Sequence, residues 1–236
     1  MIETAQTYDV TKYDRPSVTV DVVIFTLIDG SLHVLLVQRR NWPYEGHWAI
    51  PGGFVEMSES LDEAARRELE EETGLQDVYL EQLYTFGTPG RDPRTRVISI
   101  AYIALIRADA QPLRVSEEST AVHWFPVNAL PGALAFDHDD ILAAALGRLR
   151  SKLEYTTLAF QLLTEVFSIG ELKRIYEQIL GEGQLDKGNF YRKIKDSRIL
   201  ESTGERREGR GRPTTLYRFA RDRGDEQFVF RWRESR

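Results

Sequence analysis

The sequence predicts two domains of different class, an α/β domain over residues 1–151 followed by an α+β domain over residues 152–236. Strand and helix signals alternate in the first part, whereas helical patterns followed by two short strand-like runs fill the second. The charge changes at the same place. The first part carries 13 basic and 23 acidic residues, a net charge of −10, and the second carries 18 and 14, a net charge of +4. Such an asymmetry indicates two domains with different partners.

The composition excludes several classes of protein. With 42% hydrophobic and 11% aromatic residues the chain can bury a core, which excludes a disordered protein. The absence of cysteine excludes disulfide scaffolds, thiolate zinc sites and cysteine nucleophiles. No apolar run approaches the ~20 residues of a membrane helix, and the N-terminus is too polar for a signal peptide. We therefore expect a cytoplasmic protein with no membrane partner.

Apolar runs and turn signals define the elements of both domains. In the first domain, Asp29-Gly30 is a dipeptide typical of hairpin turns and lies between two β-branched runs. In the second domain, helices followed by a two-stranded hairpin describe a winged helix-turn-helix. The strands predicted for the first domain are 17–27, 32–39, 79–86 and 97–107, with helices at 61–73 and 139–152. The elements predicted for the second domain are helices at 158–166, 169–180 and 187–198 and strands at 199–202 and 215–219.

The helix predicted at 61–73 has clear ends. Ser60 is a good N-cap and Glu63 completes a capping box with it. Gly74 suits the position after the last turn. The boundaries of this helix therefore fix which of its side chains face the core.

Glutamates lie on the inward face of this helix. At about 100° per residue, Glu68 and Glu72 fall within the apolar stripe and Glu71 falls at its edge. Buried carboxylates are costly unless a cation compensates them. Carboxylates spaced i, i+3 and i+4 converge, and hard oxygen ligands suit Mg²⁺ or Mn²⁺. A structural ion-pair network with Arg67 is the alternative.

This segment resembles the Nudix box, Gly-x5-Glu-x7-Arg-Glu-(apolar)-x-Glu-Glu-x-Gly-(apolar). The matching residues are Gly53, Glu59, Arg67, Glu68, Leu69, Glu71, Glu72, Gly74 and Leu75, with no departure from the pattern. The resemblance implies a Nudix α/β/α sandwich with a mixed sheet over roughly residues 10–150. It also implies metal-assisted attack of water on a diphosphate joined to a nucleoside.

The resemblance assigns roles to individual residues. Glu68, Glu71 and Glu72 would hold the metal with help from the Gly53 carbonyl, while Arg67 would orient the glutamates and pair with Glu59. It leaves the general base unassigned. The predicted catalytic residues are thus Glu59, Arg67, Glu68, Glu71 and Glu72.

A loop between two predicted strands, residues 86–96, carries Arg91, Arg94 and Arg96. Guanidinium groups suit phosphate oxygens, so these arginines are candidate ligand contacts, with a solvated loop as the alternative. Phe86 and Tyr84 are candidates for stacking on a base, although strand aromatics more often belong to the core. The histidines show no metal-ligand spacing and we interpret them as structural; they are His33, His47, His123 and His138.

The basic residues of the second domain cluster on one helix and the segment after it. Phe190 and Ile194 form the apolar side of the helix predicted at 187–198, and Asp186 caps it. On the other side, Asn and Arg suit base edges and Lys suits phosphates. An ordinary exposed face is the alternative. The predicted DNA-binding residues of this helix are Lys187, Asn189, Arg192, Lys193 and Lys195.

The segment Arg210-Gly-Arg212-Pro resembles the core of an AT-hook. Arginines flanking a glycine can enter a narrow minor groove, where the potential is strongly negative. Because it directly follows a candidate recognition helix, we also predict Arg210 and Arg212 to bind DNA.

The two domains together resemble the Nudix-related transcriptional regulator family NrtR. The phrases that carry the resemblance are Glu171-Leu-Lys-Arg-Ile-Tyr-Glu, Asn189-Phe-Tyr-Arg-Lys, Gly211-Arg-Pro and Gly90-Arg-Asp-Pro-Arg. It implies a dimeric repressor of NAD-metabolism genes that binds a double-stranded DNA operator and responds to ADP-ribose or a related nucleotide. The intact Nudix box keeps a Mg²⁺-dependent ADP-ribose pyrophosphatase as the alternative, and a sugar-responsive regulator as a third hypothesis.

Overall fold

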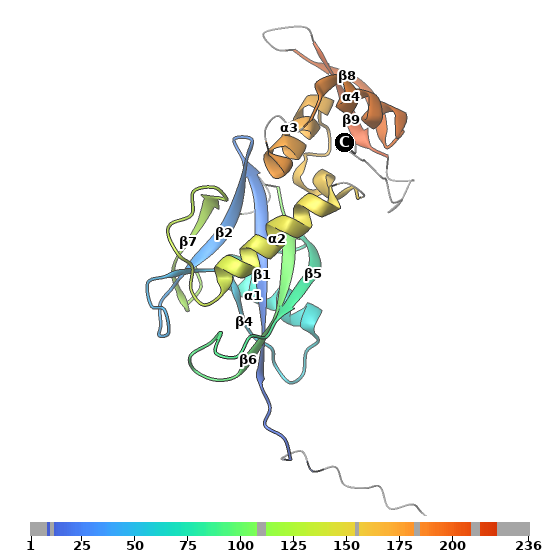
Figure 1. Ribbon diagram of the computed structural model, residues 1–236. Helices are drawn as coiled ribbons and strands as arrows, with labels where there is room; N and C mark the ends of the chain where they lie inside the picture. Colours follow the sequence, from blue (N-terminus) through green and yellow to red (C-terminus); the bar gives the residue numbers. More distant parts are fainter. Residues whose placement is uncertain are drawn as a thin grey trace, which may run out of the picture.

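The computed structural model describes residues 9, 12–107, 112–153, 156–181, 185–208 and 213–220. A seven-stranded sheet lies between two helices, and a unit of two helices and a hairpin lies beyond one end of this sandwich (Figure 1). Within the described ranges, no helix is long and apolar enough to cross a membrane.

The sheet is mixed, as predicted. Its central path runs β3-β2-β1-β6-β5, with β4 paired to β1 and β7 paired to β2. Only β1 and β6 pair in parallel; the other pairs are antiparallel. The strands are β1 (Ser17–Ile28), β2 (Ser31–Arg39), β3 (Trp48–Ala49), β4 (Gly52–Phe54), β5 (Tyr79–Phe86), β6 (Val97–Leu105) and β7 (Ser119–Pro126).

Each face of the sheet is covered by one helix, because side chains of β1 alternate between the two faces. Val22 and Ile24 pack in the cluster that contains Ala64, Ala65 and Leu69 of α1 (Leu61–Thr73). Val23 and Phe25 pack in the cluster that contains the apolar side of α2 (His138–Lys152). In Figure 1, α2 crosses the near face and α1 lies behind the sheet. The predicted α/β/α sandwich is confirmed.

The turn between β1 and β2 is the predicted one. Asp29 and Gly30 both have positive φ, +50° and +78°, as a two-residue hairpin turn requires. The end of this hairpin reaches the second unit, since Leu32 belongs to the same apolar cluster as Leu172 and Ile175.

The second unit is the predicted winged helix-turn-helix. It consists of α3 (Ile169–Leu180), α4 (Lys187–Asp196), β8 (Leu200–Arg207) and β9 (Thr214–Phe219), the last two paired antiparallel. Ser168 caps α3 in a complete capping box with Glu171, and Asp186 caps α4 through the Asn189 amide.

The sequence-based boundaries were wrong at several places. The predicted helix 158–166 is only a short 3₁₀ turn, η1 (Leu158–Leu162), because the chain then becomes extended and Phe167 pairs with Tyr217 of β9. Helix α4 ends two residues before the predicted 198, where Arg198 takes a φ of +55°. Strand β8 runs five residues past the predicted 202, while β3, β4 and β7 were not predicted at all.

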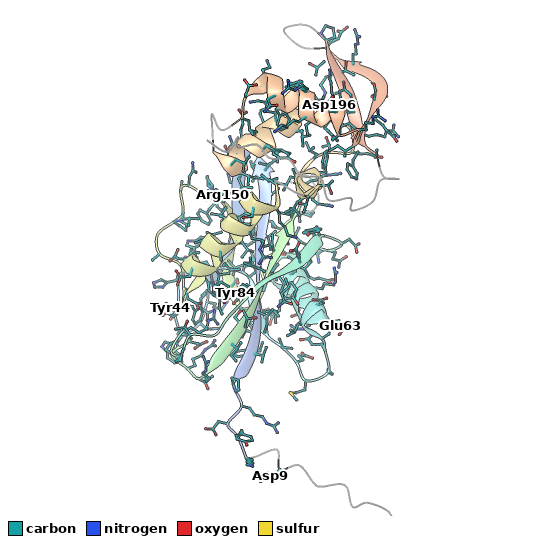
Figure 2. The ribbon with its side chains drawn as sticks, turned by 45° about the vertical axis from the view of Figure 1, so that its right-hand side comes forward. Asp9, Tyr44, Glu63, Tyr84, Arg150 and Asp196 are labelled. Carbon is teal, nitrogen blue, oxygen red and sulfur yellow. The ribbon has the colours of Figure 1, made fainter. Side chains whose placement is uncertain are left out.

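The helices of the two units share one apolar cluster. It runs from Leu149 and Leu153 at the end of α2 through η1 to Leu172 and Tyr176 of α3, and then to Phe190 of α4. A polar contact reinforces this joint, since Arg150 Nε donates to the Ile179 carbonyl at 3.0 Å. Arg150 lies where α2 meets the winged-helix unit (Figure 2). The sandwich and the winged helix are therefore joined by packing as well as by the chain.

Candidate functional site

Helix α1 presents its glutamates as its periodicity predicts. Ser60 and Glu63 cap its first turn and Gly74 ends it in the left-handed conformation, at φ +78°. Glu68 and Glu72 are buried beside the apolar residues of the helix, whereas the Glu71 side chain is 59% exposed. The inward face of α1 therefore carries two carboxylates that water reaches poorly.

Arg67 organises this group of carboxylates. Its guanidinium donates to both oxygens of Glu59, at 2.7 and 3.0 Å, and to the Phe54 carbonyl at 3.0 Å. Nη1 donates to Glu68 Oε1 at 2.8 Å and to Glu71 Oε2 at 3.0 Å. These bonds, with Glu59 first, raise the pKa of Arg67 above its usual value. The pairing of Glu59 with Arg67 is as the Nudix resemblance implies.

Gly53 is placed against Glu68. A Cβ at position 53 would lie 2.2 Å from Glu68 Oε1, so only glycine fits there without displacing the carboxylate. Gly53 is held at this position by pairing of β4 with Val20 of β1. The two ends of the Nudix box, Gly53 on β4 and helix α1, are therefore in contact through the Glu68 carboxylate.

Burial changes the acidity of the two inward glutamates. Burial raises the pKa of Glu68, against the opposing effect of Arg67. Burial also raises the pKa of Glu72 to about 7, and its carboxylate accepts a hydrogen bond from Ser116 Oγ at 3.1 Å. Both anions are thus incompletely compensated by the protein itself.

The expected convergence of three carboxylates is not seen. Glu71 turns to Arg67, and among the described residues no three His, Asp or Glu side chains stand close enough to form a metal centre. The chemistry of the site nevertheless fits a hard divalent cation, since Glu68 and Glu72 offer buried oxygens with one protein donor each. A cation held there would neutralise diphosphate charge and lower the pKa of an attacking water.

A cavity of about 280 Å³ lies beside Glu72. A smaller one of about 90 Å³ shares part of its wall. Arg39, Phe54, Arg94 and Glu118 line both. The larger cavity adds Trp42 and Glu72, and the smaller one adds Asp21, Arg91, Phe136 and His138.

Only some of the candidate residues in the 86–96 loop line these cavities. Arg94 lines both cavities, pairs with Asp92 through two nitrogens, and lies over the Phe54 ring at 5.3 Å. Arg91 lines the smaller cavity, and its side chain, which is 5% exposed, forms a two-pronged ion pair with Asp137. Arg96 and Phe86 line neither cavity, and Phe86 packs against the core.

Arg39 was not singled out in the sequence, because it ends a strand without any motif. Its Nε donates to the Pro43 carbonyl at 2.8 Å and its guanidinium lies 4.9 Å from the centre of the Phe136 ring. No carboxylate in the described part of the chain accepts a hydrogen bond from it. Burial and the nearby Arg94 lower the pKa of Arg39, and the carboxylates of Glu72, Asp92 and Glu118 partly offset this effect.

A buried polar pair also escaped the sequence analysis. Asp21, in the middle of the apolar run of β1, accepts a hydrogen bond from Ser99, and its Oδ1 lies 3.7 Å from His138 Nε2. The Ile50 amide donates to His138 Nδ1 at 2.8 Å, and burial lowers the pKa of this histidine. The sequence feature that could have indicated Asp21 was a charged residue inside a β-branched run. No sequence feature indicated His138.

Helix α4 exposes the predicted basic face. Lys187, Arg192 and Lys195 are exposed while Phe190 and Ile194 are buried, with the Phe190 ring 5.3 Å from that of Tyr176. Asn189 and Lys193 are half-buried, and Arg192 donates to Asn189 Oδ1 at 3.0 Å. The predicted contacts Arg210 and Arg212 lie outside the described residues.

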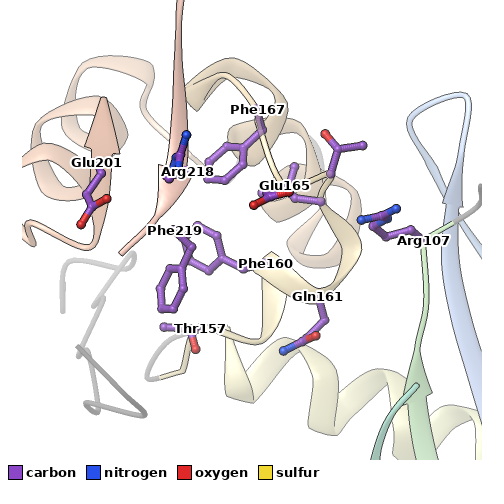
Figure 3. A pocket seen from close by; sticks show the side chains of 11 residues that line it. Arg107, Thr157, Phe160, Gln161, Glu165, Phe167, Glu201, Arg218 and Phe219 are labelled. Carbon is purple, nitrogen blue, oxygen red and sulfur yellow. The ribbon is translucent and has the colours of Figure 1, made fainter. Parts of the chain in front are cut away.

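A third cavity, of about 610 Å³, lies at the joint between the two units (Figure 3). Three rings from η1, the following segment and β9 line it, those of Phe160, Phe167 and Phe219. Phe160 lies 4.8 Å from Phe219 and 5.7 Å from Phe167 between ring centres. It contains none of the residues that the sequence predicted for a site.

Known proteins resemble the chain along most of its length. Residues 17–145 match the NUDIX domain, and residues 159–219 match the NrtR DNA-binding winged helix domain. The ADPR responsive transcriptional repressor NtrR of Acinetobacter baylyi is 41% identical over 218 residues, which cover 90% of this chain and 86% of that protein. The chain belongs to the NrtR family.

Solved structures of the NrtR family agree with this assignment. Shewanella oneidensis NrtR in complex with a 27mer DNA is 36% identical, with a TM-score of 0.78 over 90% of this chain and 98% of that one. The NUDIX domain of the same protein in complex with ADP ribose is 38% identical, with a TM-score of 0.56 over 61% of this chain and 94% of that one. The family resemblance seen in the sequence is therefore confirmed. The Nudix hydrolase family generally uses divalent metal ions.

The contact between Gly53 and Glu68 yields a test of the box in this NrtR-family chain. Gly53→Ala should cost about 1–3 kcal/mol of folding free energy and reduce the stabilisation by Mg²⁺, because the new methyl group displaces the carboxylate. Thermal and urea unfolding with and without Mg²⁺ measure both effects.

Gly147→Ala is the matched control. Gly147 lies in α2, where an added Cβ would meet open space, so alanine should stabilise by roughly 0.5–1 kcal/mol and leave the Mg²⁺ response unchanged. Equal behaviour of the two variants would contradict the role assigned to Gly53.

Proposed function

We propose that this protein is a transcriptional repressor whose Nudix domain binds ADP-ribose or a related nucleotide and whose winged helix binds a double-stranded DNA operator. The observation that carries the proposal is the match, over nine-tenths of the chain, to a repressor named for its response to ADPR. The genes that the family resemblance implies as targets are those of NAD metabolism. We further propose residues 1–151 as the sensor and 152–236 as the DNA-binding part of a cytoplasmic homodimer.

The cavity chemistry supports a nucleotide diphosphate as the effector. Arg39 and Arg94 supply positive charge to the lining of the larger cavity, and Glu72 and Glu118 supply negative charge to it. A diphosphate that carries Mg²⁺ has both charges to offer, which a neutral sugar lacks. In this proposal Glu68 and Glu72 hold the metal with the Gly53 carbonyl, and Glu71 completes the set by leaving its bond to Arg67. Arg91, held by Asp137, remains a candidate ligand contact from the smaller cavity, together with Arg94.

The exposed side of α4 supports operator binding. Arg192 and Asn189 are of the residue types that read base edges, and Lys187, Lys193 and Lys195 suit the phosphates beside them. Arg207 Nη1 donates to Glu171 Oε1 at 2.7 Å, which ties the start of the wing to α3. In a dimer, two such helices would occupy successive half-sites of one operator.

Helix α2 offers a physical connection between the two functions. Its first residue, His138, and the nearby Phe136 line the smaller cavity, and its last turns pack against α3. Tyr176 of α3 in turn packs against Phe190 of α4. Occupancy of the cavity and the placement of the DNA-binding helix are thereby linked through one rigid element.

The intact Nudix box supports a second function, Mg²⁺-dependent hydrolysis of ADP-ribose. Every position of the box is present, and Arg67, Glu59 and Glu68 are joined by hydrogen bonds. Hydrolysis and sensing are compatible, since slow turnover would reset the sensor.

Differential melting with ADP-ribose, NAD and sugars distinguishes a nucleotide sensor from a sugar sensor.

The repressor function predicts a specific loss on mutation of α4. Against a duplex that the parent selects from random sequences, Arg192→Ala should bind about 5- to 150-fold more weakly, because a base contact is worth about 1–3 kcal/mol. Arg174→Ala is the control, since Arg174 lies beside Leu27 and Gly30 rather than on α4. Gel shift measures both. Failure of the parent to select any duplex, or no effect of ADP-ribose on binding, contradicts the proposal.

The connection through α2 predicts that coupling can be weakened without loss of either binding activity. The parent should bind DNA on the order of 5- to 150-fold more weakly with ADP-ribose. Arg150→Ala should reduce that factor severalfold, because it removes the bond to Ile179, and should keep the affinity for each ligand alone within about twofold. Arg148→Ala, which loses a bond to Leu83 in the sheet, should keep the coupling. Retained coupling in both variants contradicts the role of α2.

The hydrolase function predicts formation of AMP from ADP-ribose with Mg²⁺. Chromatography should detect AMP with the parent, and the double variant Glu71→Gln/Glu72→Gln should lower the rate at least about 100-fold, because the metal loses two ligands. The exposed Glu70→Gln on the same helix is the control. If the parent forms no AMP in the presence of Mg²⁺, the hydrolase function is contradicted.

A further inference from the structure

We infer that Trp42 is the platform on which the aromatic base of the bound nucleotide stacks, with Arg39 holding a phosphate on the same wall. This inference rests on the proposed nucleotide-binding function and extends it to residues outside the Nudix box and outside the 86–96 loop.

Trp42 lies in the loop between β2 and β3 and is 69% exposed. It lines the larger cavity together with Arg39, Phe54 and Glu72. Phe54 is also exposed, at 45%. The mouth of a charged cavity thus carries two exposed aromatic side chains, and exposed apolar area of this size is unfavourable in water.

Exposure alone does not distinguish a binding residue, because isolated apolar side chains are common on protein surfaces. Tyr84 shows the difference. It is 63% exposed, but it lies on β5, meets the Phe86 ring edge-on at 5.5 Å and lines neither cavity of the site. Trp42 combines exposure with a place beside Arg39 and Glu72.

The loop that carries Trp42 is ordered by its own hydrogen bonds. Arg39 donates through Nε to the Pro43 carbonyl, and its carbonyl accepts from the Gly46 amide at 2.8 Å. Gln38 Nε2 donates to the Gly46 carbonyl at 3.0 Å, and the Tyr44 ring packs 4.8 Å from Phe136. The bond from Arg39 to Pro43 thus fixes the residue next to Trp42. A preformed platform loses little conformational entropy when a ligand binds.

The chemistry of this wall identifies the class of ligand. Arg39 has no carboxylate among its hydrogen-bond partners in the described part of the chain, so it can engage a phosphate through its remaining nitrogens. Every nucleobase has a π-face that stacks on an aromatic ring. A base on Trp42 and a diphosphate between Arg39 and the glutamates of α1 describe a nucleoside diphosphate, in which the base adds affinity independently of the metal.

The test compares three variants of the full chain by calorimetry with ADP-ribose and Mg²⁺ and by tryptophan fluorescence. Trp42→Ala should weaken ADP-ribose binding about tenfold, the loss expected for one stacked base. Trp42→Phe keeps an aromatic face and should bind within about threefold of the parent, but should lose the quenching of fluorescence that ADP-ribose causes in the parent. Tyr84→Ala should match the parent in both measurements.

The outcomes separate this inference from the function on which it rests. Parental binding combined with unchanged affinity in Trp42→Ala overturns the inference alone, as does quenching that persists in Trp42→Phe. An equal loss in Tyr84→Ala also overturns it, since the effect would then be unrelated to the cavity. A parent that does not bind ADP-ribose overturns the proposed function and the inference together. Thermal unfolding with Mg²⁺ alone should be the same for all three variants, which excludes misfolding as the cause.

Discussion

The packing of α2 against both the sheet and α3 is the constraint on which the rest of the structure depends. One face of α2 covers the sheet through Ile141 and Ala145, and its final turn shares an apolar cluster with the winged helix. Close packing leaves little free space to absorb a displacement. Under the proposed function, α2 is therefore the element through which ligand binding near its first residue would reach the winged helix packed against its last turn.

The electrostatics of the Nudix cavity follow from two opposite excesses of charge. Glu68 and Glu72 are buried with one protein donor each, and Arg39 and Arg94 stand close enough for their charges to repel. Burial penalises the charged forms of Glu68, Glu72 and Arg39, whereas Arg94 is already paired with Asp92. Together they match a ligand that carries a cation and an anion side by side. Under the proposed function, such a ligand would offset part of the desolvation of these groups, which depends on the charge arrangement and not on the fold.

The parts predicted well from the sequence were those with local physical signals. The capping residues of α1 fixed its register, and that register alone was enough to place Glu68 and Glu72 on the inward side. The cavity wall was predicted poorly, because Arg39 and Trp42 lie about a hundred residues from His138 in the chain and meet it only in the folded sheet. The three loop arginines looked equivalent in sequence, yet Arg91 and Arg94 line the cavities while Arg96 lines neither. Contacts between residues that are distant in the chain leave no local pattern in the amino-acid sequence.

Strand β1 sets the distance between the Nudix box and the winged-helix unit. Thr19 and Asp21 pair with β4, which contains Gly53 of the Nudix box. Roughly ten residues later, the same strand ends in the hairpin that meets α3. At about 3.3 Å per residue this is a separation of roughly 30 Å, held by pairing along both edges. An inserted or deleted residue within β1 would exchange its two faces and change that distance at once. A change of length is therefore expected to be more disruptive within β1 than in the longer loops of the sandwich.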